Sequence, residues 1–291
     1  MKEEKKINIV TPLNWQHHRF GWNYVVENMM SLQNDYGINC FTNGTYHKFI
    51  SNYDQIFNKK WLAFFHITKS DPNLIYHLEN NQVFHSNLEK CKGIFVLSEN
   101  SKAFLQKYLN VKIESLKHPI PPMFSEFNPD LFLKKQNKTM YFIGHWLRDY
   151  KTFDEIQSPF YKIIIKCDHT EKKINGIQFL EKNDYDSIFE SNILFLSLID
   201  SSANNTILEC ISNNTPLIIN RLPAIEEYLG KEYPLFYENI NQAQGLLTVR
   251  KIFEGYEYLK NLNKTFFSVD FFIESIKKSD IYKNIYNTKL Y

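Results

Sequence analysis

The residues best suited to chemistry follow an apolar run near residue 200. The run from Ile193 to Leu198 predicts a buried strand, and the mostly polar residues 201–205 supply turn and N-cap chemistry. Apolar residues from Ile207 to Ile211 then form one helical face, and we expect Glu209 on the first turn of that helix. Such a strand-to-helix junction places backbone N–H groups and a carboxylate at the carboxyl edge of a sheet, where phosphate and ribose hydroxyls can bind.

Two interpretations of this junction are open. In the first, backbone N–H groups of Asn204, Asn205 and Thr206 hold a diphosphate, and Glu209 holds the ribose hydroxyls. In the second, Glu209 only complements the dipole of its helix in a generic nucleotide-type unit. We favour the first interpretation because the features of this stretch match, in the same order, those of the family named below.

A second loop with suitable chemistry follows the predicted strand Met140 to Ile143. Gly144 at the strand end would let the backbone approach a ligand closely. Arg148 could neutralise a diphosphate through two-point hydrogen bonds and Lys151 as a point charge, with His145 as a helper. The alternative is an ordinary solvated loop of mixed charge.

One histidine in the first half also follows a predicted strand. His66 ends the apolar run Trp61 to Phe65, so we expect it at the carboxyl edge of a sheet, facing the cleft between two domains. There it could hydrogen-bond a hydroxyl group of a ligand or act as a base on one. A purely structural histidine is the alternative. Arg19 and Gly21, in the loop after the first predicted strand, fit a ligand-binding role loosely.

Short apolar runs alternate with helical patterns along the chain, which predicts α/β architecture. The pattern occurs twice, and the proline-bearing stretch 119–137 separates the halves. We therefore expect two Rossmann-like, doubly wound domains, residues 1–122 and residues 123–291. After Asn241 the pattern is wholly helical, so we expect helices to close the second domain.

The stretch from residue 200 to 230 resembles the nucleotide-sugar site of GT-B glycosyltransferases, especially the retaining group known as family 4. In that group a Glu, seven residues and a second Glu precede a small-residue helix, Thr-Pro, a strand and a further Glu. Glu209 matches the second Glu and Thr215-Pro216 the Thr-Pro. Either Glu226 or Glu227 matches the last Glu, whereas Ser201 stands where the family has its first Glu. That difference leaves a retaining or an inverting outcome open.

The resemblance implies an enzyme that moves a sugar from a nucleoside diphosphate sugar to a glycan or other hydroxyl acceptor. The donor would bind mainly to the second domain, and the first would supply the acceptor site. Two alternatives are a nucleotide-sugar 2-epimerase on the same fold and a catalytically inactive nucleotide-binding module. An oxidoreductase that binds a dinucleotide is disfavoured, because no G-x-G-x-x-G follows the first predicted strand.

Composition restricts the partners and cofactors further. The net charge of +2, with both signs interspersed, gives no reason to expect a nucleic-acid partner, although a weak contact with a membrane surface stays open. The four cysteines form no C-x-x-C pair and are typical of reduced thiols in a cytoplasmic protein. Asp184 and Asp186 have the D-x-D spacing of metal-binding GT-A enzymes, but they also suit a helix start, so we predict no metal and no cofactor.

Overall fold

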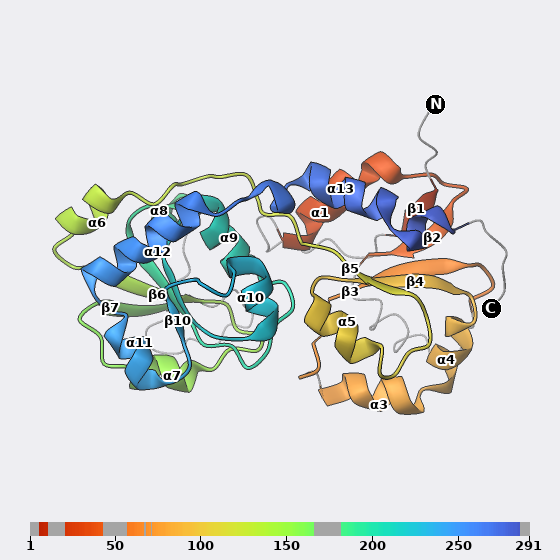
Figure 1. The fold of residues 1–291 in the computed structure, drawn as a ribbon, viewed down its shortest axis with the longest axis horizontal. Coiled ribbons are helices and arrows are strands. Elements are labelled where there is room, and N and C mark those ends of the chain that lie inside the picture. The colour runs from red at the N-terminus through yellow and green to blue at the C-terminus, as the bar shows by residue number, and fades with distance from the viewer. Residues whose placement is uncertain are drawn as a thin grey trace. The chain divides into compact units, whose positions relative to one another are not determined.

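The computed structural model describes residues 6–10, 21–42, 57–66, 68–70, 72–165 and 182–285. The chain divides into two compact units, shown as ribbons in Figure 1. The first unit is Met1–Pro119 together with Lys264–Tyr291, and the second is Ile120–Asn263. Each contains a parallel five-stranded sheet, which confirms the predicted α/β class.

The first unit is built on a parallel sheet with the strand order β1-β2-β3-β4-β5. Its strands are β1 (Ile7–Val10), β2 (Ile38–Phe41), β3 (Trp61–Phe65), β4 (Cys91–Val96) and β5 (Ile113–Ser115). Its helices are α1 (Gly21–Met29), η1 (Met30–Leu32), α3 (Pro72–Asn80), α4 (Gln82–Leu88), α5 (Glu99–Leu105), η2 (Thr265–Phe267), α13 (Val269–Lys278) and α14 (Asp280–Lys283). All five residues of β3 are buried, as expected for a central strand covered on both faces.

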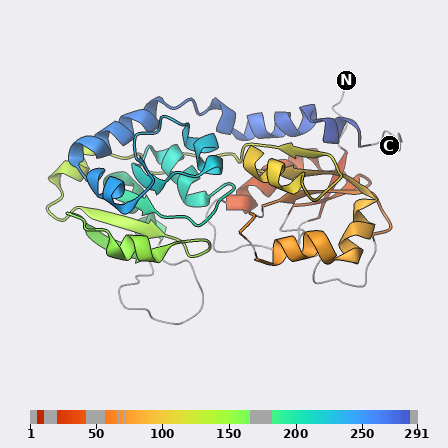
Figure 2. The ribbon, with the colours of Figure 1, turned by 60° about the horizontal axis from the view of Figure 1, so that its bottom comes forward.

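Two hydrophobic clusters cover opposite faces of this sheet. Alternate residues of β3 divide between them: Leu62 and Phe64 belong to one cluster, and Ala63 and Phe65 to the other. The first cluster joins the sheet to α1, α13 and α14, and the second joins it to α3, α4 and α5. Figures 1 and 2 show the same separation, with α3 and α4 on the face of the sheet opposite to α13.

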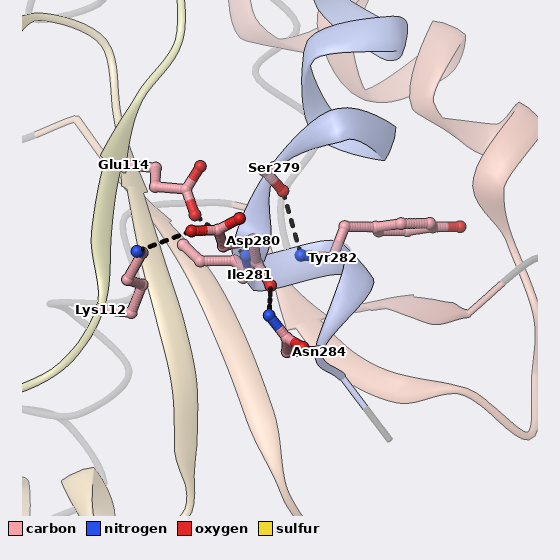
Figure 3. Close-up of polar contacts among 7 residues, drawn as sticks. All are labelled: Lys112, Glu114, Ser279, Asp280, Ile281, Tyr282 and Asn284. Atoms are coloured by element: carbon pink, nitrogen blue, oxygen red, sulfur yellow. Dashed lines mark hydrogen bonds and ion pairs between the residues drawn. The ribbon is translucent and has the colours of Figure 1, made fainter. Parts of the chain in front are cut away.

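The C-terminal helices α13 and α14 belong to the first unit, which differs from the expected boundary at residue 123. Phe272 and Ile276 of α13 and Ile281 of α14 lie in the first unit's core. Figure 3 shows the polar contacts that hold α14 on β5: Lys112 Nζ lies 2.9 Å from the Asp280 carboxylate, and the backbone N–H of Ile281 donates to Glu114 at 2.9 Å. The amphipathic pattern predicts these helices but does not specify which sheet they cover.

The second unit has a parallel sheet with the strand order β10-β9-β8-β6-β7. Its strands are β6 (Thr139–Ile143), β7 (Tyr161–Ile165), β8 (Ile193–Leu196), β9 (Leu217–Asn220) and β10 (Phe236–Tyr237). Its helices are α6 (Pro129–Lys134), α7 (Tyr150–Glu155), α8 (Lys182–Ser191), α9 (Asn205–Asn213), α10 (Pro223–Leu229), α11 (Ile240–Gly245) and α12 (Val249–Asn261). The predicted strand at 177–179 lies outside the described residues.

The stretch expected to be a linker is largely ordered structure of the second unit. It contains α6, whose N-terminus is capped by the Asn128 side chain. Asn213, fully buried at the end of α9, accepts hydrogen bonds from the backbone N–H groups of Phe124 and Ser125 at 3.0 and 2.9 Å. Ser212 donates to the carbonyl of Pro121 at 2.8 Å. Helix α9 therefore anchors this stretch while its other end opens at the carboxyl edge of the sheet.

Candidate functional site

Helix α9 begins at the carboxyl edge of the second sheet, soon after β8 ends, as the sequence predicted. Asn204 is its N-cap, and the side chain accepts from the backbone N–H of Ile207 at 3.4 Å. Asn214 ends the helix in the left-handed conformation that asparagine tolerates, with a φ of 56°. Thr206 and every later residue of α9 are buried, so the helix is fixed along its length.

Glu209 lies on the second turn of α9, because the helix begins at Asn205; the prediction of a first-turn position was wrong. The side chain is 7% exposed, and its Oε2 accepts a hydrogen bond from the Tyr185 hydroxyl of α8 at 2.8 Å. A buried carboxylate needs such donors to offset the loss of hydration. The sequence contained no signal for this pair, since the two residues lie on different helices.

The loop before α9 contains three consecutive buried polar residues, Asp200, Ser201 and Ser202. Asp200 accepts from the backbone N–H of Ser201 at 2.8 Å, and the Ser201 hydroxyl donates to the carbonyl of Ser202 at 3.2 Å. The Ser202 hydroxyl is buried, and within the described part of the chain it has no hydrogen-bond partner. A buried hydroxyl without a partner costs free energy, so this one is suited to a ligand oxygen beside the start of α9.

The loop after β6 lies against the loop after β8. The backbone N–H of Asp149 donates to the carbonyl of Ser197 at 2.8 Å, and that of Ile199 donates to the carbonyl of Leu147 at 3.1 Å. The stretch from Gly144 to Asp149 thus lies beside the residues that lead into α9. The two loops chosen from sequence are neighbours at one edge of the second sheet.

Arg148 is folded back over its own loop. Its Nε donates to the carbonyl of Ile143 at 3.1 Å and its Nη1 to that of Trp146 at 3.2 Å. Gly144 has a φ of +95°, and a Cβ there would lie 3.0 Å from Arg148 Nη2. Glycine at 144 thus permits the guanidinium to cover the strand end, and two of the five arginine donors hold the loop's shape.

Lys151 and His145, which were predicted to help bind the diphosphate, are both exposed. Lys151 lies in the first turn of α7, its side chain is 80% exposed, and its ammonium lies 3.7 Å from the Glu155 carboxylate. An exposed pair of this kind contributes little stability, so the ammonium can reorient toward an anion. His145 is exposed beside Gly144.

Asp149 is a charged group at this edge that the sequence interpretation did not single out. It caps α7 through Lys151 and Thr152 backbone N–H groups and also accepts from the Ser197 hydroxyl at 3.3 Å. Burial acts to raise the pKa of Asp149, but hydrogen bonds from Thr152, Ser197 and Lys151 outweigh it and lower the pKa. The carboxylate is therefore charged at neutral pH and joins the two loops.

Of the two glutamates matched to the family's last Glu, Glu226 is already paired. Arg221 Nη1 lies 2.5 Å from the Glu226 carboxylate, and its guanidinium also lies over the ring of Phe236 at 4.5 Å. Asn220 at the end of β9 both donates to and accepts from the backbone of Leu198, each at 2.8 Å. The end of β9 thereby fixes the same loop that leads to α9.

In the first unit, His66 lies at the carboxyl end of β3, where the sequence placed it. Its Nε2 lies 3.3 Å from the carbonyl oxygen of Thr42, which also accepts from the indole N–H of Trp22. Because a carbonyl only accepts, Nε2 carries the hydrogen. Burial, then the nearby His118, lower the pKa of His66 to about 3, although the bond to Thr42 acts in the opposite direction.

His118 is a second histidine at this edge, and sequence reasoning missed it. It is 4% exposed, and its Nδ1 lies 2.7 Å from the carbonyl oxygen of Pro119. The Trp22 ring contacts both imidazoles, with centroids 3.8 Å from His66 and 5.7 Å from His118. Burial lowers the pKa of His118 to about 4. Both imidazole rings are neutral at physiological pH. They can donate and accept hydrogen bonds, but they are weak bases.

Some sequence-based candidates cannot be placed. Arg19 lies outside the described residues, as does the side chain of Asp184. Among the described residues, no group of three or more His, Cys, Asp or Glu side chains is arranged to hold a metal ion. No helix in the described ranges is long and apolar enough to cross a membrane.

A surface hollow on the first unit lies apart from these residues. It is lined by Lys102, Gln106 and residues 111–114 together with Asp280. Lys112 and Asp280 form the ion pair seen in Figure 3, and Glu114 accepts from the backbone of α14. Lys112, Glu114 and Asp280 serve the attachment of α14, so we do not assign the hollow as the functional site.

Comparison with known proteins gives matches at the level of structure. No protein-family model matches the chain, and neither does any curated protein. A sucrose-phosphate synthase from Thermosynechococcus elongatus matches with a TM-score of 0.62 at 12% identity, over 91% of this chain and 78% of that one. A trehalose-6-phosphate protein from E. coli bound with UDP-2-fluoro glucose matches with a TM-score of 0.53 at 11% identity, over 89% and 78%.

TarM is a third similar structure, with a TM-score of 0.58 at 13% identity, over 91% of this chain and 58% of TarM. At such identities the likeness concerns the fold, and the assignment to the retaining family 4 stays a prediction. This chain has two α/β units, each built on a parallel five-stranded sheet. Together with the similarity to these solved structures, this establishes that the chain has the GT-B fold.

Proposed function

We propose that this protein is a glycosyltransferase that moves a sugar from a nucleoside diphosphate sugar to an acceptor hydroxyl. The observation that carries the proposal is the buried Glu209 on α9, a helix that opens at the carboxyl edge of the second sheet. Ligands of doubly wound sheets bind at this edge, and a carboxylate there can hold ribose hydroxyls. The similar structures support a nucleotide-sugar donor, since one of them was solved with UDP-2-fluoro glucose.

The leaving diphosphate would bind at the start of α9. Backbone N–H groups of Asn204 to Thr206 are the first of the helix, and helix N-termini attract phosphate. The buried hydroxyl of Ser202 and the ammonium of Lys151 would add donors. Negative charge on the diphosphate grows as the glycosidic bond breaks, so these contacts would stabilise the transition state more than the bound donor.

In the proposed function, Arg148 would both stabilise its own loop and bind the diphosphate. Its bonds to the carbonyls of Ile143 and Trp146 hold the turn at Gly144. The guanidinium is a charge at the strand end where a diphosphate would lie. We therefore keep it with Lys151 as the proposed diphosphate clamp, with His145 as an exposed helper.

The first unit would supply groups for the sugar and the acceptor. His66 is neutral, with Nε2–H bonded to Thr42, so we propose that it orients a hydroxyl by hydrogen bonding and does not act as the base. Cys40, Cys91 and Cys210 are free thiols, which fits the proposed cytoplasmic location. No metal or cofactor has a part in the proposal.

The test is a screen of nucleotide sugars for hydrolysis and transfer, with the anomeric form of the product read by NMR. We expect one donor to be cleaved and the released nucleoside diphosphate to inhibit. Turnover that changes the sugar without an acceptor would instead identify a 2-epimerase. Ser201, in place of the family's Glu, favours a second candidate, an inactive nucleotide-binding module, which would bind without cleavage or transfer. Failure to bind any nucleoside diphosphate would refute the proposed function.

A further inference from the structure

We propose that Tyr185 is a positioning residue that orients the Glu209 carboxylate and thereby sets the preference of the site for ribose over deoxyribose. The inference rests on the proposed function, because it deepens the role of the same carboxylate. The geometry that carries it is one hydrogen bond between two helices of the second unit. The Tyr185 hydroxyl on α8 lies 2.8 Å from Glu209 Oε2 on α9.

The tyrosine ring is held by its surroundings. It meets the ring of Phe189, one turn further along α8, at a centroid distance of 5.4 Å. Phe189 is fully buried and meets Phe124 edge-on at 5.2 Å. This side of α8 is thus packed against the segment that Asn213 of α9 also fixes. A hydroxyl on such a ring has a defined position relative to α9.

A donor fixed in position beside a buried carboxylate has a directional effect. A carboxylate only accepts hydrogen bonds, and a tyrosine hydroxyl can donate one. The Tyr185 bond occupies roughly one of four lone-pair sites of Glu209 and fixes the rotation of the carboxylate plane. Two neighbouring ribose hydroxyls are both donors, so their binding depends on where the remaining lone pairs point. Removing the phenol hydroxyl should therefore weaken ribose recognition although Tyr185 itself contacts no ribose.

The burial of Glu209 supports the same arrangement. The carboxylate is 7% exposed, so few water molecules can replace a lost protein donor. With the Tyr185 bond absent, the carboxylate would rotate toward other donors and lose its fixed direction.

The experiment compares wild type with Tyr185→Phe, which keeps the ring and its contact with Phe189. Affinities for UDP, GDP and ADP, and for their 2′-deoxy counterparts, are measured by isothermal titration calorimetry. Tyr161→Phe is the matched control, because Tyr161 is 60% exposed on β7 and plays no part in the proposed site. Glu209→Gln and the double variant complete a double-mutant cycle.

We expect wild type to prefer its ribonucleotide over the deoxynucleotide by about tenfold, and Tyr185→Phe to lose most of that preference. Deoxynucleotide affinity should stay within about twofold, and Tyr161→Phe should match wild type. In the Glu209→Gln background the added Tyr185→Phe change should have little further effect.

Three outcomes would overturn the inference. An unchanged ribose preference in Tyr185→Phe excludes the positioning role while leaving the proposed function intact. Additive losses in the cycle would mean that Tyr185 acts independently of Glu209. Absence of nucleotide binding in wild type would refute the proposed function and this inference with it, so the two failures are distinguishable.

Discussion

Acidification should destabilise the first unit through its two histidines. His118 is buried with a pKa lowered to about 4, and the pKa of His66 is lowered to about 3 by burial and by His118. Both values lie below the ordinary histidine pKa of about 6.5, which applies in the unfolded chain. The unfolded state therefore binds protons first as pH falls. The stabilising contribution is complete above about pH 6.5 and decreases as pH falls toward 4 and then 3.

The size of the effect follows from the difference between the folded and unfolded pKa values. Each pH unit below the unfolded pKa costs about 1.36 kcal/mol per histidine, as long as the folded histidine stays neutral. At pH 5 that is about 2 kcal/mol for each ring, and about 4 kcal/mol for both. Domain stabilities are about 5–15 kcal/mol, so a loss of this size would be readily measured.

The assay is urea unfolding of wild type and His118→Gln at pH 7.5 and pH 5. Glutamine can still donate to the carbonyl of Pro119, to which His118 Nδ1 is bonded at 2.7 Å, but it does not titrate. We expect the variant to lose about half of the pH dependence. The reasoning fails if wild type and variant show the same dependence, or if either imidazole titrates near pH 6.5 by NMR.

Three further predictions concern the second unit. Glu209→Gln should weaken nucleotide binding by about tenfold or more, the effect of losing a charge-assisted bond, and unchanged affinity by calorimetry would exclude the ribose role. Lys151→Ala should lower kcat while circular dichroism stays unchanged, since its side chain is 80% exposed; wild-type kcat would place the diphosphate contact elsewhere. Asn213→Ala should cost about 2 kcal/mol in urea unfolding, because it leaves the N–H groups of the half-buried residues Phe124 and Ser125 without their acceptor; a loss below about 1 kcal/mol would contradict this.

The buried strands could be predicted because a strand that is covered on both faces needs an apolar residue at nearly every position. The runs at Trp61–Phe65 and near Ile193 are observed as β3 and β8. The place of the closing helices was not predictable, because an apolar helical face fits either sheet. Phe272 and Ile276 of α13 lie in the first unit's core, which only the three-dimensional structure reveals.

At the candidate site, too, features set by neighbouring residues could be predicted from the sequence, whereas contacts between distant residues could not. The sequence indicated that α9 starts near Asn204, since an N-cap side chain acts within three residues. The exact first residue was not fixed by pattern, and a shift of the helix start moves Glu209 from the first turn to the second. The Tyr185 bond joins two helices and has no local signature. His118 was missed because it precedes prolines that indicated a linker.

In the proposed function, the loop between β8 and α9 would determine whether the protein cleaves a nucleotide sugar or only binds it. Ser201 is buried, and its hydroxyl donates to the carbonyl of Ser202, so this residue stabilises the loop and brings no charge to a sugar. The neighbouring Asp200 accepts from the backbone of Ser201 and thereby supports the same loop. The start of α9 and the exposed Lys151 do not depend on a carboxylate at position 201. Stabilisation of the leaving diphosphate can therefore persist where the charge beside the sugar is absent. On this reasoning Ser201→Glu should raise turnover in an active enzyme without tightening nucleotide binding, because the new charge would act near the sugar and not near the diphosphate.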